Sequence, residues 1–558
     1  MIHPNPSSAM AWVIVDELAR CGVTRAVISP GSRSTALVLA LNAREEFETA
    51  IHIDERSAGF RALGLSAGCG RPGLAVTTSG SAVANLLPAV VEAERSAIPL
   101  ILLTADRPPE MVRRRTNQTM DQESVFSGFL RGRFQLGPAV DTAGEPETWR
   151  EAVKAAVALA NGGEGVPGPV QINVAFEEPT VPVADDGRSK AAPYATDTGR
   201  RREEPVRSST PLNVTPADVT SGKRSLVIAG RGDYDAAALV AVCRSAGIPI
   251  LATALSGARG AGTVSGYHHI LVDGVPAGLE PDWVYVVGQT GPSDRLAAVM
   301  QAGTPVVHAD RWGLFSDASG TMTDALRSNP VESLKRLAGD QEQGWSDRWS
   351  GTDSAVRDAI DMVLAETDQP TGPGIARSLN DVDWLALVVA SSLSIRDVDS
   401  QLTRSGWVFA NRGLSGIDGF NSTALGVADC RPGTVAVTGD LAFLHDSNAF
   451  LTDQMPSTVF LVVDNGGGGL FDLLPQAQHA PDFERLFITP PGRDLSVLAG
   501  FHGLAFSAVK SVADVAPELR RAMQNEGVNV VRVTVDRHAD LSMRRALDDA
   551  ARAVLGVR

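Results

Sequence analysis

Short apolar runs alternate with helical segments along this chain, and this alternation limits the folds that the chain can adopt. In the first third, a helical segment at 8–21 precedes four apolar runs: 25–29 (RAVIS), 50–54 (AIHID), 74–78 (LAVTT) and 99–106 (PLILLTAD). Apolar strands of this length, separated by helices, are typical of a parallel sheet that is covered on both faces. The sequence therefore predicts an α/β fold.

The same alternation restarts twice. The later apolar runs lie at 225–230, 249–254, 283–289, 304–310, 385–392, 407–413, 434–440, 458–465 and 529–536, and a final helix starts at about 539. A chain of 558 residues is also too long for one ordinary core. We therefore expect three tandem α/β domains with mainly parallel sheets. The predicted parts are an N-terminal domain (1–183), a linker (184–222), a central Rossmann-like domain (223–340), a connecting segment (341–383) and a C-terminal domain (384–558).

Charge and composition exclude several kinds of partner. The formal net charge is −15, which argues against nucleic acid or an anionic membrane surface as a partner. No apolar run is long enough to span a bilayer, and residues 1–10 lack a basic-then-apolar signal pattern. We expect a cytoplasmic protein without membrane insertion. Such a protein must gather its arginines locally if it handles anionic substrates.

The cysteines and histidines do not indicate a structural metal site. Cys21, Cys69, Cys243 and Cys430 are widely spaced and form no CxxC pair, and the nine histidines show no HExxH pattern. We expect four reduced thiols in a reducing compartment, with no disulfide framework and no zinc.

Two polar turns at strand ends suggest a cation site in the last third. Gly439 and Asp440 end one predicted strand, and Asp464, Asn465 and a run of glycines end the next, with Asn465 following Asp440 by 25 residues. Consecutive strand ends of a parallel sheet lie at the same carboxyl edge, where α/β folds bind ligands. A carboxylate, an amide oxygen and glycine carbonyls suit a hard cation such as Mg²⁺. Either motif alone is more often an ordinary turn.

This pairing resembles the diphosphate-binding motif of thiamine-diphosphate-dependent enzymes, in which GDG is followed after some two dozen residues by NN. The resemblance implies thiamine diphosphate and Mg²⁺ (or Mn²⁺) as cofactors. It implies Asp440, Asn465 and the carbonyl of Gly467 as metal ligands. Leu441 replaces the third glycine of the motif and Asp464 replaces its first asparagine; neither change removes a side-chain ligand. The family fold comprises pyrimidine-binding, central and diphosphate-binding domains.

The same family requires a glutamate near the N-terminus, after a strand, to hydrogen-bond the aminopyrimidine ring of the cofactor. Glu55, after the run AIHID, fits this role. There it would promote removal of the proton from the thiazolium carbon, the step that prepares the cofactor for decarboxylation. The alternative is that Asp54 and Glu55 are only an acidic helix start that complements the helix dipole.

Further segments narrow the resemblance to synthases of the menaquinone pathway. They include SPGSRSTAL (29–37), IDERSAGF (53–60), TSGSAVANLLPAV (78–90), TNQTMDQ (116–122), NRGLSGIDG (411–419) and NGGGGLFDLLP (465–475). The implied activity is that of a transferase: decarboxylation of 2-oxoglutarate and 1,4-addition of the succinyl carbanion to isochorismate. The residues implied in substrate binding are Ser32, Arg33, Arg107, Asn117, Gln118, Ser392, Arg396 and Arg412. Guanidinium groups suit bidentate binding of carboxylates, although each single Arg could equally be a salt-bridged surface residue.

The resemblance also implies cofactor-binding residues and an assembly. Beside Glu55 and the metal ligands, these residues are Ser415, Ile417, Gly439, Leu441, Ala442, Leu470 and Phe471. Ile417 would support the bent cofactor, although a buried core Ile would look the same in sequence. The family shares its active sites between the N-terminal domain of one subunit and the C-terminal domain of another. A homodimer is therefore implied as the minimum, with a homotetramer as the expected assembly.

Two other interpretations remain open at this point. One keeps the cofactor but changes the reaction, to an acetolactate-synthase-like carboligase or a simple 2-oxo acid decarboxylase. The other is a nucleotide-binding or regulatory α/β protein, for which the best feature is the partial GxGxxD pattern at 230–235. The central domain carries no catalytic motif, so it is either structural or the site of a regulatory ligand.

Overall fold

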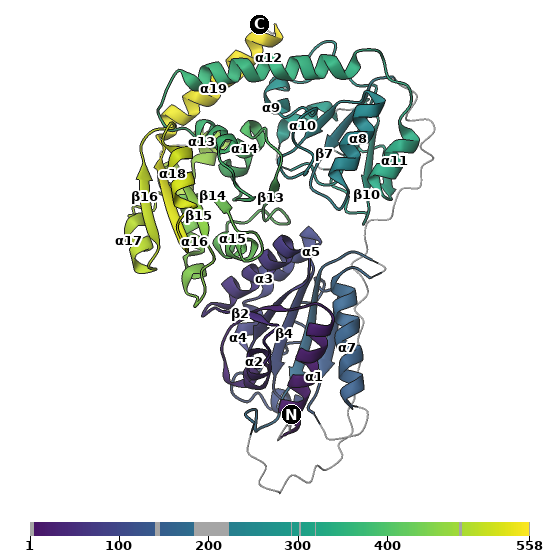
Figure 1. Cartoon of the computed structure of the whole chain (residues 1–558), viewed down its shortest axis with the longest axis vertical. Helices are drawn as coiled ribbons and strands as arrows, with labels where there is room; N and C mark the ends of the chain where they lie inside the picture. Colours follow the sequence, from purple (N-terminus) through teal and green to yellow (C-terminus); the bar gives the residue numbers. More distant parts are fainter. Residues whose placement is uncertain are drawn as a thin grey trace. The chain divides into compact units, whose positions relative to one another are not determined.

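The computed structural model describes residues 5–139, 145–163, 165–182, 223–291, 293–300, 303–317, 320–478 and 482–556 (Figure 1). The predicted linker 184–222 lies outside these residues. Three sheets are formed, and the described strands of the first two pair only in parallel. In the third sheet the pairs β12–β13 and β16–β17 are parallel as well. The α/β prediction with three parallel sheets is confirmed.

The first sheet has six strands in the order β2-β1-β3-β4-β6-β5. Its strands are β1 (Arg25–Ile28), β2 (Glu48–Ile51), β3 (Gly73–Thr77), β4 (Leu100–Asp106), β5 (Gly132–Leu136) and β6 (Pro169–Ala175). Its helices are α1 (Pro6–Arg20), η1 (Ser32–Ser34), α2 (Thr35–Asn42), α3 (Glu55–Cys69), α4 (Ser81–Ala84), α5 (Leu87–Ser96), α6 (Pro109–Arg113) and α7 (Glu145–Ala160).

Alternate residues of these strands enter two different cores. Ala26 and Ile28 of β1 join a core with α1, α2 and α7, whereas Val27 joins a core with α3 and α5. This alternation follows from the two-residue period of a strand, and it explains why the strands are apolar throughout. Both faces of the first sheet are thus covered by helices, as predicted.

The second sheet has the order β11-β10-β9-β7-β8 and the third β13-β12-β14-β15-β17-β16. Their strands are β7 (Ser225–Ala229), β8 (Ile250–Ala252), β9 (Trp283–Val287), β10 (Val306–Asp310), β11 (Asp324–Arg327), β12 (Ala386–Val389), β13 (Trp407–Phe409), β14 (Thr434–Gly439), β15 (Thr458–Asp464), β16 (Ala505–Val509) and β17 (Val528–Thr534).

The remaining helices follow β7 in the chain. They are α8 (Ala236–Ala246), α9 (Tyr267–Ile270), α10 (Asp294–Val299), α11 (Pro330–Leu337), α12 (Trp345–Ala365), α13 (Gly372–Ser378), η3 (Leu379–Asp381), α14 (Leu393–Gln401), α15 (Phe420–Ala428), α16 (Asp440–His445), η4 (Ser447–Phe450), η5 (Gly469–Leu473), η6 (Pro475–Gln478), η7 (Glu484–Ile488), α17 (Leu495–Phe501), α18 (Val515–Ala522) and α19 (Arg537–Leu555). The segment TGPG (371–374) starts α13, because the Thr371 side chain accepts a hydrogen bond from the N–H of Gly374 and caps the helix.

By their contacts the residues divide into two compact units. Of the described residues, unit 1 contains those within Met1–Arg207, Asn411–Thr434 and Ala442–Thr458, and unit 2 those within Ser208–Ala410, Val435–Leu441 and Val459–Arg558. Within unit 1, α15 packs on α3. A Cβ added at Gly64 would lie 2.2 Å from the carbonyl oxygen of Thr423, and one at Gly426 would lie 2.1 Å from that of Arg61. Glycine therefore allows these two helices to approach closely.

The cysteine prediction is wrong for one pair. Cys69, the last residue of α3, is joined to Cys430 by a disulfide, whereas Cys21 and Cys243 are free thiols. The two bonded residues are 361 positions apart, and only the packing of α15 on α3 brings them together. Within the described part of the chain, no helix is both long and apolar enough to cross a bilayer.

Candidate active site

The predicted site residues fall into two sets, one in each unit. Unit 1 holds Ser32, Arg33, Glu55, Arg107, Asn117, Gln118, Arg412, Ser415, Ile417 and Ala442. Unit 2 holds Ser392, Arg396, Gly439, Asp440, Leu441, Asn465, Gly467, Leu470 and Phe471. Each set is described within its own unit.

In unit 2, Asp440 and Asn465 lie at the ends of neighbouring strands. Asp440 directly follows β14, which ends at Gly439, and Asn465 directly follows β15. The two strands are adjacent in the third sheet, so both side chains start from the same edge, as the spacing predicts. The backbone N–H of Gly467 is among the groups that lower the pKa of the Asp440 carboxyl, so the turn after β15 lies next to Asp440.

Two buried oxygens at this edge have no partner. Oδ2 of Asp440 and Oδ1 of Asn465 are inaccessible to solvent and accept no hydrogen bond from any described residue. Burial, followed by the nearby carboxylate of Asp464, raises the pKa of Asp440 to about 7. Asp464 itself is held by Nε of Arg532 at 2.7 Å. Unsatisfied buried oxygens are costly, so this arrangement favours a bound electropositive group.

The glycines after Asn465 allow the turn to form. Gly466 and Gly467 have φ values of 73° and 129°, in the left-handed region that side chains rarely adopt. A Cβ at Gly467 would also lie 2.1 Å from the carbonyl oxygen of Ile488, and one at Gly469 would lie 2.5 Å from Nδ2 of Asn465. Close packing around Asn465 therefore requires these glycines. They do more than make the loop flexible.

The donor set at this edge fits a hard cation. It offers one carboxylate and one amide oxygen on rigid strand ends, which suits Mg²⁺ with positions left for phosphate oxygens. Among the described residues no group of three or more His, Cys, Asp or Glu side chains could hold a metal, so this set differs from a zinc-type site. Leu441 and Ala442 follow Asp440 in α16.

In unit 1, Arg107 is fixed at the end of β4. Its Nη1 donates to the carbonyl oxygen of Gln118 at 2.8 Å and to Oγ of Ser79. Gln118, with φ 58°, returns a hydrogen bond from Nε2 to the carbonyl oxygen of Ser79 at 2.9 Å. Burial and the nearby Arg33 lower the pKa of Arg107, although a guanidinium stays charged at physiological pH. The structure thus brings Arg107, Gln118 and Arg33 together.

Arg33 is buried at the start of the segment that follows β1. Its Nη1 donates to the carbonyl oxygen of Phe176 at 2.9 Å, and its Nη2 lies 3.2 Å from Oε1 of Glu178. A Cβ at Gly31 would lie 2.3 Å from that of Thr78, so glycine allows this segment to approach the end of β3. Ser32 and Asn117 are exposed.

Glu55 is the first residue of α3. Asp54 caps the helix by accepting from the N–H of Arg56, and the side chain of Glu55 is half-buried. Oε2 of Glu55 accepts a hydrogen bond from Nδ2 of Asn85 at 3.0 Å. The orientation of Glu55 is therefore defined by a hydrogen bond. A carboxylate that only complements the helix dipole would not need such a partner.

The loop at 411–419 is held by a single carboxylate. Glu92 accepts hydrogen bonds from the N–H groups of Gly413 at 2.7 Å and Leu414 at 2.8 Å. Ser415, with φ 60°, is exposed, and Ile417 is 39% exposed. Ile417 is therefore no core residue in this structure, and an apolar side chain presented on a fixed loop suits contact with a ligand. Arg412 is half-buried in the same loop.

A cavity of about 310 Å³ in unit 2 is lined by two further predicted residues, Arg396 and Leu470. Nη1 of Arg396 donates to the carbonyl oxygen of Ser392 at 2.8 Å, which places Ser392, the N-cap of α14, behind the guanidinium. Other residues of the lining come from the central region, among them His268 and Arg295. Phe471 packs against Phe487, with ring centroids 5.5 Å apart.

Comparison with known proteins identifies the family. Residues 9–125 match the family described as thiamine pyrophosphate enzyme, N-terminal TPP binding domain. The chain is also similar to three proteins named 2-succinyl-5-enolpyruvyl-6-hydroxy-3-cyclohexene-1-carboxylate synthase. The one from Thermobifida fusca is 38% identical over 99% of this chain and all of the relative. Those from Rubrobacter xylanophilus (35%) and Halobacterium salinarum (34%) cover 97% and 98% of this chain, and 98% and 99% of the relatives.

This chain belongs to the family of 2-succinyl-5-enolpyruvyl-6-hydroxy-3-cyclohexene-1-carboxylate synthases.

Family membership confirms the resemblance drawn from the motifs and makes the chain an enzyme that uses thiamine diphosphate. The nucleotide-binding interpretation of residues 230–235 is not supported: Gly230 packs against the carbonyl of Gln289, where a Cβ would lie 2.2 Å from the oxygen. The roles of the individual site residues stay predictions.

Several residues that support this synthase-family site were missed by sequence reasoning. Behind Arg107 lies a buried polar network in which Gln122 accepts from the N–H of Gly80 at 2.9 Å and donates to Asn173 at 2.9 Å. Asn173 also accepts from Oγ1 of Thr104 at 2.7 Å. TNQTMDQ contains Gln122, but nothing local marks it as buried. Asn85 lies within the quoted segment TSGSAVANLLPAV without a sign of its contact to Glu55.

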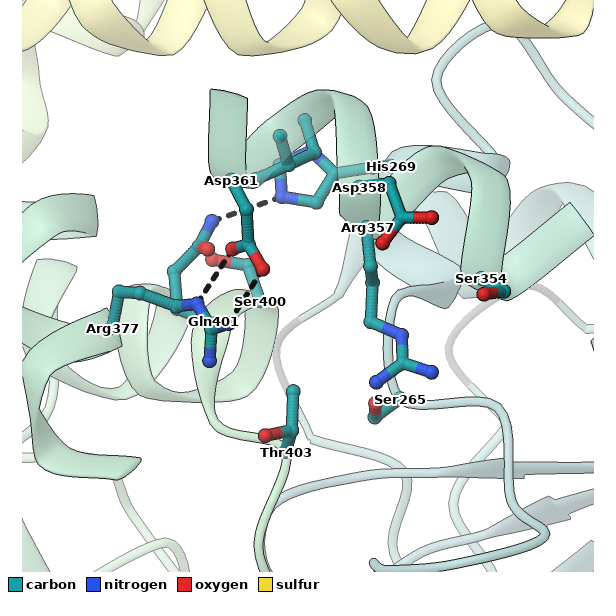
Figure 2. A pocket seen from close by; sticks show the side chains of 11 residues that line it. Ser265, His269, Ser354, Arg357, Asp358, Asp361, Arg377, Ser400, Gln401 and Thr403 are labelled. Carbon is teal, nitrogen blue, oxygen red and sulfur yellow. Dashed lines mark hydrogen bonds and ion pairs between the residues drawn. The ribbon is translucent and has the colours of Figure 1, made fainter. Parts of the chain in front are cut away.

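A second cavity in unit 2, of about 120 Å³, adjoins the one that contains Arg396 and shares His269, Ser400 and Gln401 with it. Figure 2 shows its polar lining, in which Nε2 of His269 lies 2.9 Å from Nε2 of Gln401 and Arg377 pairs with Asp361. Burial lowers the pKa of His269 to about 3, so this ring is neutral. The paired charges leave little net attraction for an ionic ligand.

Proposed function

We propose that this chain decarboxylates 2-oxoglutarate and adds the succinyl fragment in 1,4 fashion to isochorismate. The products are 2-succinyl-5-enolpyruvyl-6-hydroxy-3-cyclohexene-1-carboxylate and CO₂, in menaquinone biosynthesis. The observation that carries this proposal is the similarity to synthases of that name over 97–99% of the chain. The reaction places the enzyme among the carbon–carbon bond-forming transferases, and we propose a cytoplasmic location for it.

The proposed metal is Mg²⁺, or Mn²⁺, held by Asp440, Asn465 and the carbonyl of Gly467. Support comes from the two unpartnered oxygens at the ends of β14 and β15, which a divalent cation would complete. The cation would in turn hold the diphosphate of the cofactor near the glycine-rich turn. When bound, thiamine diphosphate supplies the electron sink that decarboxylation of a 2-oxo acid requires.

The chain itself contributes proton handling and anion binding. Glu55, oriented by Asn85, holds a carboxylate that can exchange a proton with the aminopyrimidine ring. Arg33, Arg107, Arg396 and Arg412 are proposed to bind the substrate carboxylates. Arg107 and Arg396 are each anchored by backbone carbonyls, so they keep their charge available for an anion. Ser32, Asn117, Gln118 and Ser392 would add neutral hydrogen bonds.

The proposed cofactor contacts lie on the loop at 411–419, at the end of β14 and in the helices α16 and η5. Ile417, exposed on the loop that Glu92 holds, would support the bent cofactor. Ser415, Gly439, Leu441, Ala442, Leu470 and Phe471 complete the proposed cofactor set. These residues are apolar or neutral, which suits contact with the aromatic rings of a cofactor.

The activity test follows isochorismate consumption with thiamine diphosphate and Mg²⁺, with 2-oxoglutarate present or omitted. We expect loss of isochorismate only when both 2-oxoglutarate and cofactor are present. Glu55→Gln should lower this activity by about 10²–10⁴-fold while leaving cofactor affinity measurable. Turnover of pyruvate without isochorismate would instead support the acetolactate-synthase-like or simple decarboxylase alternative.

We further propose that active sites are shared between subunits of a homodimer, assembled as a homotetramer. Mixing separately inactive Glu55→Gln and Asp440→Asn subunits tests this sharing. If each site takes Glu55 from one subunit and Asp440 from its partner, random exchange should restore about a quarter of the wild-type activity, because a mixed dimer contains one intact site. If both residues serve the site of their own chain, no activity returns.

A further inference from the structure

The disulfide between Cys69 and Cys430 opens into a cavity of unit 1. Both residues are half-buried, and both line a cavity of about 490 Å³ together with Gly22, Thr24, Arg25 and residues 71–73. This volume lies in the range of pockets that hold small organic ligands. The predicted site residues of unit 1 are absent from its lining, so it is distinct from the site described above.

The lining of this cavity is cationic. Arg25, Arg71 and Arg431 contribute to it, against one carboxylate, that of Glu48. Nη1 of Arg25 lies 3.4 Å from Sγ of Cys69 and 3.1 Å from Sγ of Cys430. The same nitrogen donates to the carbonyl oxygen of Asp429 at 2.6 Å, which fixes the guanidinium beside the sulfurs. A cation in this position stabilises a thiolate.

We propose that the Cys69–Cys430 pair is a thiol–disulfide exchange site for a small anionic thiol. The thiolate of the incoming molecule attacks Sγ of Cys69 and forms a mixed disulfide. The bond between the two protein sulfurs breaks, and its electron pair leaves on Sγ of Cys430, the sulfur nearer to Arg25.

A second molecule of the same thiol completes the reduction. Its thiolate attacks the small-molecule sulfur of the mixed disulfide, and the electron pair leaves on Cys69. The two protein thiolates take up the two protons that the small thiols release. In total, two thiols and one protein disulfide give one small disulfide and two protein thiols.

The contact between α3 and α15 does not depend on the disulfide alone. Nε and Nη2 of Arg61 hold the Asp429 carboxylate at 2.9 and 3.0 Å, next to Cys430. The close contacts at Gly64 and Gly426 also join α3 to α15 without the disulfide. Reduction therefore leaves other connections between these helices in place, and exchange does not require unfolding.

The test compares the reduction rates of the full-length protein by three thiols of similar size. They are anionic 2-mercaptoethanesulfonate, neutral 2-mercaptoethanol and cationic cysteamine. Samples are quenched with acid and alkylated, and the peptides that contain Cys69 and Cys430 are quantified by mass spectrometry. Each rate is divided by the rate for an unstructured disulfide peptide, which removes differences in intrinsic reactivity. We expect the anionic thiol to react about tenfold faster than the cationic one, with the ratio shrinking at high salt.

Matched variants assign this preference to the cavity. Arg71→Gln and Arg431→Gln should bring the ratio toward one, whereas Arg114→Gln, an exposed arginine outside the lining, should preserve it. Arg25→Gln should slow all three thiols, because the leaving thiolate loses its cation. A ratio of one in the wild type would overturn the proposal. So would reduction that proceeds only at the rate of global unfolding, or free thiols at both positions after purification without reductant.

Discussion

Arg107 and Asp440 both directly follow a strand of a parallel sheet, but their surroundings differ. Arg107, after β4, donates to Ser79 and Gln118 and rests on a buried network that includes Gln122. Asp440, after β14, keeps one buried carboxylate oxygen that accepts no hydrogen bond from any described residue. Neutral backbone oxygens can hold a cation in place before its anionic ligand arrives. A buried anion with an unpartnered oxygen, in contrast, gains the missing interaction only when its ligand binds.

This difference predicts that one substitution lowers the activity of the enzyme with cofactor and metal but raises the stability of the protein without them. Asp440→Asn should lower the activity of the loaded enzyme by more than about 10³-fold, because the proposed ligand set loses its only negative side chain. In the protein stripped of cofactor and metal, the same change should raise the free energy of unfolding by about 1–3 kcal/mol, since a buried unpaired charge is removed. Activity assays and chemical denaturation of the two forms measure both effects.

Asp464→Asn is the matched control for this experiment. Asp464 already pairs with Arg532, so its replacement should leave a cation unpaired and destabilise the stripped protein. If Asp440→Asn also destabilises the stripped protein, the Asp440 oxygen has an internal partner, and the contrast with Arg107 fails.

Arg107→Lys tests the other half of the comparison, the cation that protein oxygens hold in place. Lysine keeps the charge but cannot hold Ser79, Gln118 and a substrate carboxylate with one planar group. We expect kcat/KM for the anionic substrates to fall by about 10²-fold, mainly through KM, with unchanged affinity for thiamine diphosphate. Arg114→Lys, an exposed neighbour, should change neither. A fall in cofactor affinity for Arg107→Lys would show that the two sets of residues are not separable in this way.

The sequence predicts the two sets of residues unequally well. Asp440, Asn465 and Arg107 stand at strand ends, as predicted, because each of these strands contains an apolar run that is visible in the sequence. β2 ends at Ile51, three residues earlier than predicted, so Glu55 starts a helix after a short turn instead of following the strand directly. β6 was not predicted, because Gln171 and Asn173 interrupt its apolar run.

Gln171 and Asn173, which interrupt the apolar run of β6, belong to the buried network behind Arg107. Nε2 of Gln171 donates to Oγ1 of Thr104 at 3.1 Å, and Nδ2 of Asn173 donates to Oδ2 of Asp106 at 2.9 Å. Polar residues in a strand look like a loop in sequence, and only pairing of the strands shows that they satisfy one another. The Cys69–Cys430 pair was missed for a related reason, since no local pattern reports a contact between distant helices.

A pH experiment extends the comparison to a second buried carboxylate, one whose hydrogen bonds are satisfied. Asp446 accepts from the N–H of Ser422 at 2.7 Å and from the hydroxyls of Ser422 and Ser57. Burial nevertheless raises the pKa of Asp446 to about 7, because these bonds only partly offset the loss of hydration. A raised pKa in the folded state means that the carboxyl stabilises the fold when protonated, and this stability is lost as the pH rises through about 7.

The expected loss for the wild type between pH 5 and pH 8 is on the order of 2 kcal/mol in the free energy of unfolding. In Asp446→Asn this pH-dependent contribution should disappear, whatever the absolute stability of the variant. Urea denaturation at several pH values measures the slope for both proteins. Equal slopes would mean that hydrogen bonds alone compensate the buried charge of Asp446.

The smallest expected effect separates a ligand-facing side chain from a core side chain. Ile417 is 39% exposed, whereas Leu425, in the helix that follows the same loop, is fully buried. Ile417→Ala should change the free energy of unfolding by less than about 1 kcal/mol, while Leu425→Ala should cost about 2–5 kcal/mol. If Ile417 contacts the cofactor, its replacement should weaken thiamine diphosphate binding about tenfold, measured by calorimetric titration. If Ile417→Ala instead lowers the stability as much as Leu425→Ala and leaves the cofactor affinity unchanged, Ile417 is a structural residue. Ser415 would then be the remaining proposed cofactor contact on the loop that Glu92 holds.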